Sequence, residues 1–153
     1  MDFGIASIPS SGTKFSMDLF KLPNGKSTRH FDGGVSWHDF VSTRNIICPM
    51  RHPIEVTKTW RYRRVGDQSL ADLWDCYDSL LRFEKHINFW FPIESIAKEQ
   101  CLQRINEAMN CNFKTNWEKL GSSGGLGFIL DGDEERAAPY IDFYDRIVRE
   151  CEE

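Results

Sequence analysis

One apolar segment limits the possible folds of this chain more than any other. Residues 45–50 form a nearly continuous apolar run, and Pro53 opens a helical pattern directly behind it. A strand that is apolar on both faces is typical of a parallel sheet covered by helices on both sides. Pro49 suits a strand terminus better than a strand centre, because proline has no N–H to donate. The run therefore predicts a buried strand of a parallel sheet.

Strands and helices alternate along the rest of the chain. The apolar spacing and the Gly and Pro breaks predict strands at 3–8, 28–31, 45–50 and 88–93. They predict helices at 13–21, 37–41, 54–64, 69–85, 95–109 and 139–151. This alternation indicates an α/β fold, a central parallel sheet flanked by helices in three layers. With 153 residues the chain is expected to form a single compact domain, 1–153.

The composition excludes several classes of function. Aromatic residues make up 13% of the chain and hydrophobic residues 41%, which is typical of a globular protein. The net charge of −4 gives no general attraction to nucleic acid or to anionic lipid. No apolar run approaches the roughly 20 residues that a membrane helix needs. We therefore expect neither nucleic acid nor a membrane as a partner.

The five cysteines indicate a compartment. They are spread widely, are odd in number and include no C-x-x-C pair, so neither a disulfide framework nor a zinc knuckle is expected. Cys48 lies in the apolar run and is expected to be a buried small hydrophobe. A reducing, cytoplasmic location follows, and it is compatible with a bacterial or viral origin.

The stretch SIPSSGTKFS, residues 7–16, follows the first strand and opens the first helix. In a strand–turn–helix setting, backbone N–H groups can gather round an anion at the helix N-terminus. The alternative is an ordinary tight turn rich in Ser and Gly. The candidate anion-binding residues are Ser10, Ser11, Gly12, Thr13, Lys14 and Phe15.

A second stretch follows the buried strand. Arg51 ends that strand, Pro53 starts a helix, and Thr59 lies two helical turns further on. Arginine can hold a phosphate bidentately, and a hydroxyl on the helix can add a second donor. In the alternative interpretation, Arg51 forms an ion pair with Glu55 and Thr59 only packs.

Taken together, the two stretches resemble those of the P-loop sulfotransferases. That family has a loop P-K-S-G-T-T-W after its first strand, which Pro9–Phe15 matches in part, and a later motif R-x-P-x-D-V followed by a serine. Arg51, Pro53 and Val56 match the second motif, with Glu55 in place of Asp and Thr59 in place of Ser. A later strand that ends in an acidic residue, as Glu94 would, also fits. The resemblance runs from the start of the chain to about Phe113.

The resemblance implies a P-loop NTPase-like fold and a function. The donor would be 3′-phosphoadenosine 5′-phosphosulfate (PAPS), and the desulfated product would be PAP. The loop would bind the 5′-phosphate, and Arg51 and Thr59 would bind the 3′-phosphate. His30, at the end of the preceding strand, would be the catalytic base, with His38 as its rival. The family's loop lysine is replaced by Ser10, so Lys14 would have to stabilise the leaving group.

Two further functions stay open at this stage. A small P-loop kinase would use ATP and Mg²⁺, and Lys14 in a Ser-Gly-Thr-Lys loop suits it. A catalytically inactive nucleotide-binding module would explain Ser10 and the short chain. For an enzyme, the acceptor is not identified. Its pocket would be open to a large acceptor or completed by a second copy in a homodimer.

Two charged runs lie outside these motifs. Residues 61–64, Arg-Tyr-Arg-Arg, could contact nucleic acid or the donor, or form a solvated helix end. Residues 131–135 lack the spacing of a calcium loop and are expected to form a solvated acidic turn. A glycine- and serine-rich loop is expected at 121–127.

Overall fold

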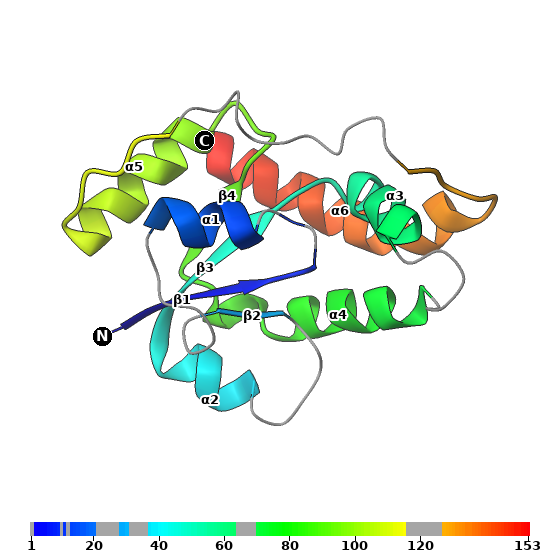
Figure 1. Cartoon of the computed structure of the whole chain (residues 1–153), viewed down its shortest axis with the longest axis horizontal. Helices are drawn as coiled ribbons and strands as arrows, with labels where there is room; N and C mark the ends of the chain where they lie inside the picture. The colour runs from blue at the N-terminus through cyan, green and yellow to red at the C-terminus, as the bar shows by residue number, and fades with distance from the viewer. Residues whose placement is uncertain are drawn as a thin grey trace.

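A computed structural model describes residues 2–9, 11, 13–20, 28–30, 37–63, 70–115 and 127–153. Within these residues, four strands form one sheet in the order β2-β1-β3-β4 (Figure 1). The strands are β1 (Asp2–Ser7), β2 (Thr28–His30), β3 (Arg44–Met50) and β4 (Phe89–Pro92). Every strand pair is parallel. The prediction of a parallel α/β sheet is confirmed, and each predicted strand corresponds to an observed one.

The apolar run at 45–50 lies inside β3, in the middle of the sheet. β3 pairs with β1 on one side, where Ile5 is opposite Ile47, and with β4 on the other, where Cys48 is opposite Trp90. Ile46, Ile47 and Cys48 are fully buried, as expected for a strand covered on both faces. Pro49 lies one residue before the end of the strand.

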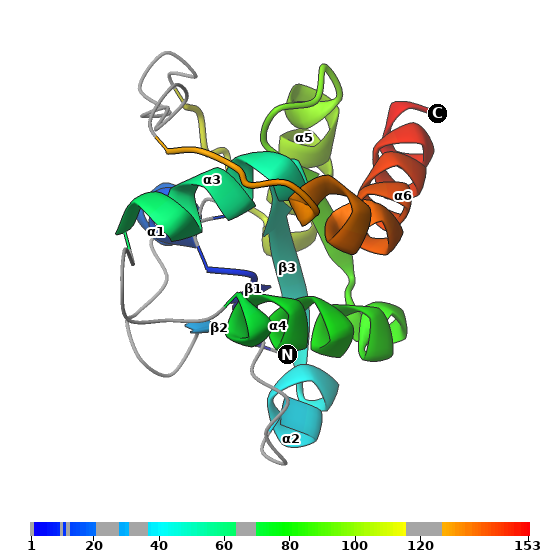
Figure 2. The ribbon, with the colours of Figure 1, turned by 90° about the vertical axis from the view of Figure 1, so that its right-hand side faces the viewer.

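Helices cover both faces of the sheet, and Figures 1 and 2 show the same layers from two directions. One face carries α1 (Thr13–Phe20) and α5 (Lys98–Met109). The opposite face carries α2 (Trp37–Ser42) and α4 (Ala71–Arg82), and α4 is followed by the short 3₁₀ helix η1 (Glu84–His86). α3 (Pro53–Arg63) and α6 (Asp133–Glu152) pack against each other. None of the described helices combines the length and the apolar character that a membrane crossing requires.

The last helix differs from its prediction. α6 begins at Asp133, six residues before the predicted start, so Pro139 lies inside it. Proline was expected at a helix start, because in a helix interior it removes one hydrogen bond. The stronger start signal is the cluster of acidic residues at 133–135, which suits the positive end of the helix dipole.

α6 also covers the outer edge of the sheet. The Trp90 ring of β4 packs edge-on against Phe143, with centroids 5.7 Å apart. Tyr140 stacks on Tyr77 of α4, with centroids 4.8 Å apart. α6 thus contacts β4, α4 and α3, and it lies beside the strand edge that would otherwise be open to pairing.

Candidate functional site at the carboxyl edge of the sheet

The strand order defines where a ligand is expected to bind. From β1 the chain moves to β2 on one side, and it then returns to β3 on the other side of β1. In open parallel sheets, ligands bind outside the carboxyl ends of the strands at the point where the winding direction reverses. Here that point lies between the ends of β1 and β3, where the two motifs of the sequence follow their strands.

The loop after β1 has the predicted strand–turn–helix form. β1 ends at Ser7, and α1 begins at Thr13. The turn between them is closed by the Ser11 N–H, which donates to the Ile8 carbonyl over 3.2 Å, and Ser11 is buried. Ser10 and Gly12 lie outside the described residues, and of Thr13, Lys14 and Phe15 only the backbone is described. Their roles in phosphate binding stay predictions.

The segment after β3 is held by its own side chains. Arg51 follows the strand directly and is half-buried, and Pro53 is the first residue of α3. His52 caps this helix: its Nδ1 accepts a hydrogen bond from the Ile54 N–H over 3.1 Å. Because Nδ1 is the acceptor, neutral His52 carries its proton on Nε2 and can donate from there.

Glu94 ties the ends of β3 and β4 together. Its Oε1 accepts a hydrogen bond from the His52 N–H over 2.6 Å. The Ile93 N–H donates to the Met50 carbonyl over 3.1 Å, so the two chains still run side by side beyond the strands. The Glu94 carboxylate fixes the backbone next to Arg51, which favours a defined position for the guanidinium.

Two tyrosines from distant helices lie behind this segment. The Tyr144 ring of α6 packs edge-on against the His52 ring, with centroids 5.3 Å apart. Burial raises the pKa of Tyr144, and the negative charge of Glu94 adds to the effect, while Arg51 opposes it. Burial also raises the pKa of Tyr77, and Arg51 again acts against the shift. The charge of Arg51 therefore partly offsets the rise in pKa at both tyrosine hydroxyls.

The Tyr77 hydroxyl is buried and has no hydrogen-bond partner among the described residues. Neither Tyr77 nor Tyr144 is among the site residues predicted from the sequence. The available signal was the helical spacing of Tyr140 and Tyr144, which share one face of α6. That spacing indicates a buried face, but it does not indicate that the face reaches Arg51.

Thr59 lies in the interior of α3. It is 2% exposed, and its hydroxyl donates to the Glu55 carbonyl over 3.0 Å. The Glu55 carboxylate accepts a hydrogen bond from Lys58 over 3.2 Å. A hydroxyl has a single proton, so Thr59 would have to turn away from Glu55 to donate to a phosphate.

Of the two candidate bases, His30 lies at the carboxyl edge of the sheet, where the β1 loop and Arg51 also lie. His30 is the last residue of β2, and its backbone is in register with Ser7 at the end of β1. His38 belongs to α2, which precedes the opposite end of β3 and lies near that end in Figure 1. Only the backbone of each histidine is described, so the chemical role of His30 stays a prediction.

The two charged runs outside the motifs contact one another through Arg61 and Asp133. Arg61 binds Asp133 bidentately: Nε and one terminal nitrogen donate to its two oxygens, each over 2.8 Å. The Leu130 N–H also donates to Asp133 over 2.8 Å. The prediction of a solvated acidic turn is therefore wrong at Asp133, which is buried where α6 meets α3. Arg61 is engaged in holding these helices together, and Arg64 lies outside the described residues.

The Arg61–Asp133 ion pair lowers the pKa of Asp133. The hydrogen bonds from Arg61 hold the pKa of Asp133 below its usual value, burial opposes the shift, and the Leu130 N–H supports it. A bidentate pair joining two helices fixes their relative position more firmly than a single contact. Because Tyr144 is on α6 and Arg51 precedes α3, the pair also sets the spacing between these two parts of the site.

Comparisons of the whole chain with protein-family models, with curated proteins and with solved structures find no match.

Proposed function

We propose that the chain binds a nucleotide with two separate phosphate groups at the carboxyl edge of the sheet and acts as a PAPS-dependent sulfotransferase. The observation that carries this proposal is the meeting of three segments at one edge. The loop before α1, Arg51 and the backbone of His30 all lie at the carboxyl ends of β1, β3 and β2. The proposed site would thereby combine a candidate anion-binding loop, a cation and a titratable residue at the ends of neighbouring strands.

Each segment has a separate task in binding. The amides at the start of α1 suit the 5′-phosphate, because they point along a helix dipole whose positive end favours anions. Arg51 suits the 3′-phosphate, since its guanidinium can make two hydrogen bonds to one phosphate. The bond from His52 to Glu94 and the cap on α3 keep the backbone around Arg51 in place. Thr59 would be a secondary contact because its proton is used within α3.

The chemistry needs a base and a cation. PAPS supplies an activated sulfuryl group for transfer to an acceptor hydroxyl or amine. His30 would take the proton of the acceptor, since a neutral imidazole is an effective base near neutral pH. Lys14, in the first turn of α1, would neutralise the charge that develops on the leaving oxygen.

The first test is calorimetric binding of PAP, compared with ADP and with ATP plus Mg²⁺. Arg51→Ala removes the guanidinium at the carboxyl end of β3, and Arg44→Ala removes one at the amino end of the same strand. A charge-assisted bidentate contact is worth about 1.5–3 kcal/mol per hydrogen bond, so Arg51→Ala is expected to weaken PAP binding at least about tenfold. Arg44→Ala is expected to leave binding unchanged.

Binding and transfer are separated by a second variant. His30→Ala is expected to keep PAP affinity and to lose transfer of labelled sulfate from PAPS to a panel of hydroxyl acceptors. Full transfer by His30→Ala would refute the role of His30 as the catalytic base. A preference for ATP with Mg²⁺ would favour a kinase, and equal loss of affinity in the two arginine variants would refute the assigned edge. PAP binding without transfer to any acceptor would favour an inactive nucleotide-binding module.

A further inference from the structure

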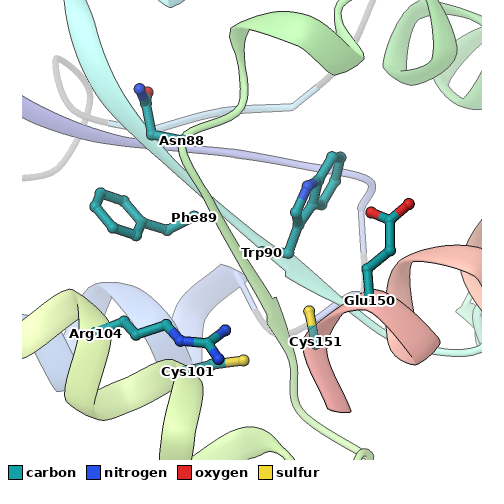
Figure 3. Close-up of a pocket in the computed structure, with 7 residues that line it drawn as sticks. All are labelled: Asn88, Phe89, Trp90, Cys101, Arg104, Glu150 and Cys151. Carbon is teal, nitrogen blue, oxygen red and sulfur yellow. The ribbon is translucent and has the colours of Figure 1, made fainter. Parts of the chain in front are cut away.

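A hollow lies between α5, β4 and the end of α6 (Figure 3). It has a volume of about 160 Å³ and is lined by Asn88, Phe89, Trp90, Cys101, Arg104, Glu150 and Cys151. Its lining combines two aromatic rings, an amide, a cation, a carboxylate and two thiols. Nothing in the proposed sulfuryl transfer uses these groups.

Two of the five cysteines meet in this hollow although they are far apart in the chain. Cys101 and Cys151 are 3% and 6% exposed, and both are free thiols. Both thiols line the same hollow and influence each other's ionisation. Figure 3 shows both sulfur atoms facing the space between α5 and α6, with Arg104 beside them. The two sulfurs therefore border the same hollow, which is partly open to solvent.

A further contact holds the two helix ends together. Ser95, just before α5, donates from its hydroxyl to the Glu152 carboxylate over 2.9 Å. The same hydroxyl oxygen accepts a hydrogen bond from the Ala97 N–H over 3.0 Å. Glu152 is the neighbour of Cys151, so this contact keeps Cys151 next to the start of α5.

The environments of the two thiols differ. Cys101 lies in the first turn of α5, where the helix dipole favours a negative charge, and Arg104 is one turn further along the same face. Cys151 lies in the last turn of α6, where the dipole opposes a negative charge, and it follows Glu150. The interaction with Cys151 lowers the pKa of Cys101, burial opposes the shift, and Arg104 supports it. The same pair interaction, with burial, raises the pKa of Cys151.

We propose that Cys101 and Cys151 form a reversible dithiol–disulfide site that reacts with small-molecule disulfides, with Cys101 as the attacking thiol and Cys151 as the resolving thiol. The Cys101 thiolate attacks one sulfur of the disulfide, forms a mixed disulfide and expels the other half, which takes up the proton that Cys101 has lost. Cys151 then gives up its proton and attacks the Cys101 sulfur, and the second half leaves as a thiol. The protein loses two hydrogen atoms, and the small disulfide is reduced to two thiols.

A reversible site agrees with the reducing compartment expected from the sequence. In such compartments, disulfides are usually transient and serve catalysis or redox sensing. Attack by a thiolate through a mixed disulfide is the general route of exchange, and a low thiol pKa with access to the reagent favours it. The oxidised form would join the start of α5 to the end of α6.

The test treats the native 153-residue chain with glutathione disulfide and maps the products by non-reducing digestion and mass spectrometry. We expect a peptide pair joined through Cys101 and Cys151 that separates on addition of dithiothreitol. Cys151→Ser is expected to accumulate glutathione on Cys101. In Cys101→Ser, modification of Cys151 is expected to be at least about tenfold slower than modification of Cys101 in Cys151→Ser.

Cys111→Ser is the matched control, because Cys111 is exposed and lies just beyond α5. It is expected to form the same joined peptide as the unaltered chain. Absence of the joined peptide while Cys111 becomes glutathionylated would overturn the proposal, and equal rates in the two single variants would overturn the assigned roles. If a variant fails to fold, alkylation of the unaltered chain decides: Cys101 must react before Cys48, whose pKa burial raises.

Discussion

The Arg61–Asp133 pair gives the sharpest prediction about stability. The side chains are 21% and 8% exposed, and three hydrogen bonds of 2.8 Å end on the Asp133 carboxylate. Asp133→Ala leaves the Arg61 charge largely buried without its carboxylate, and losing one partner of a buried pair costs about 3 kcal/mol or more. For a chain of this length, 3 kcal/mol corresponds to a decrease in Tm of about 6–12 °C.

Urea unfolding followed by tryptophan fluorescence measures this loss. Asp131→Asn is the matched control, since Asp131 is exposed two residues away, and it is expected to change the unfolding free energy by less than about 0.5 kcal/mol. A double-mutant cycle with Arg61→Met is expected to give a coupling energy of about 2 kcal/mol. Equal effects of Asp133→Ala and Asp131→Asn, or a coupling energy near zero, would refute the reasoning.

The same pair sets a dependence on pH. The pKa of Asp133 is lower in the folded chain than its unfolded value of about 3.9. The ionised carboxylate therefore adds stability above pH about 4, and this contribution is lost as the pH falls through the folded pKa. Subtracting the unfolding free energy of Asp133→Asn from that of the unaltered chain isolates the effect. A difference that does not shrink between pH about 4 and the folded pKa would contradict this assignment.

Other substitutions test local features, each by chemical unfolding. Tyr77→Phe removes a buried hydroxyl without a described partner and is expected to raise the unfolding free energy by about 1 kcal/mol; a clear decrease would mean that the hydroxyl is satisfied. Gly127→Ala would place a Cβ 2.2 Å from a backbone oxygen of α3, whereas at Gly132, also at positive φ, the space is open. Gly132→Ala is expected to cost about 1–2 kcal/mol and Gly127→Ala at least about 1 kcal/mol more, and equal costs would count against the close approach. Asn88→Ala removes the acceptor of the Ile46 N–H and is expected to cost about 1–3 kcal/mol, while Asn88→Asp, which keeps an acceptor, should cost less.

The parts of the fold that could be predicted depend on local patterns. The apolar run of β3 and the proline at the start of α3 are local signals, and both elements were placed within one or two residues. The start of α6 was misplaced because Pro139 was given more weight than the acidic first turn at 133–135. Asp133 was assigned to solvent for a related reason, since its partner Arg61 lies 72 residues away.

The candidate site divides in the same way. The turn after β1 and the position of Arg51 follow from sequence order, because parallel strands bring their carboxyl ends to one edge. Tyr77 and Tyr144 could not be placed there, since their approach depends on how α4 and α6 pack. The Cys101–Cys151 pair was equally hidden, because the spacing of cysteines along a chain says little about which of them meet.

The cover that α6 gives to β4 has a consequence for how the chain is made. Residues 133–152 are synthesised after β4, so β4 can join the sheet before α6 is available to cover its edge. During that interval the Trp90 side chain and one row of β4 backbone groups are open to another nascent chain. We expect a variant truncated after residue 131 to self-associate through this edge, and added α6 peptide to suppress the association. α6 would then protect the β4 edge from intermolecular pairing as well as stabilise the folded chain.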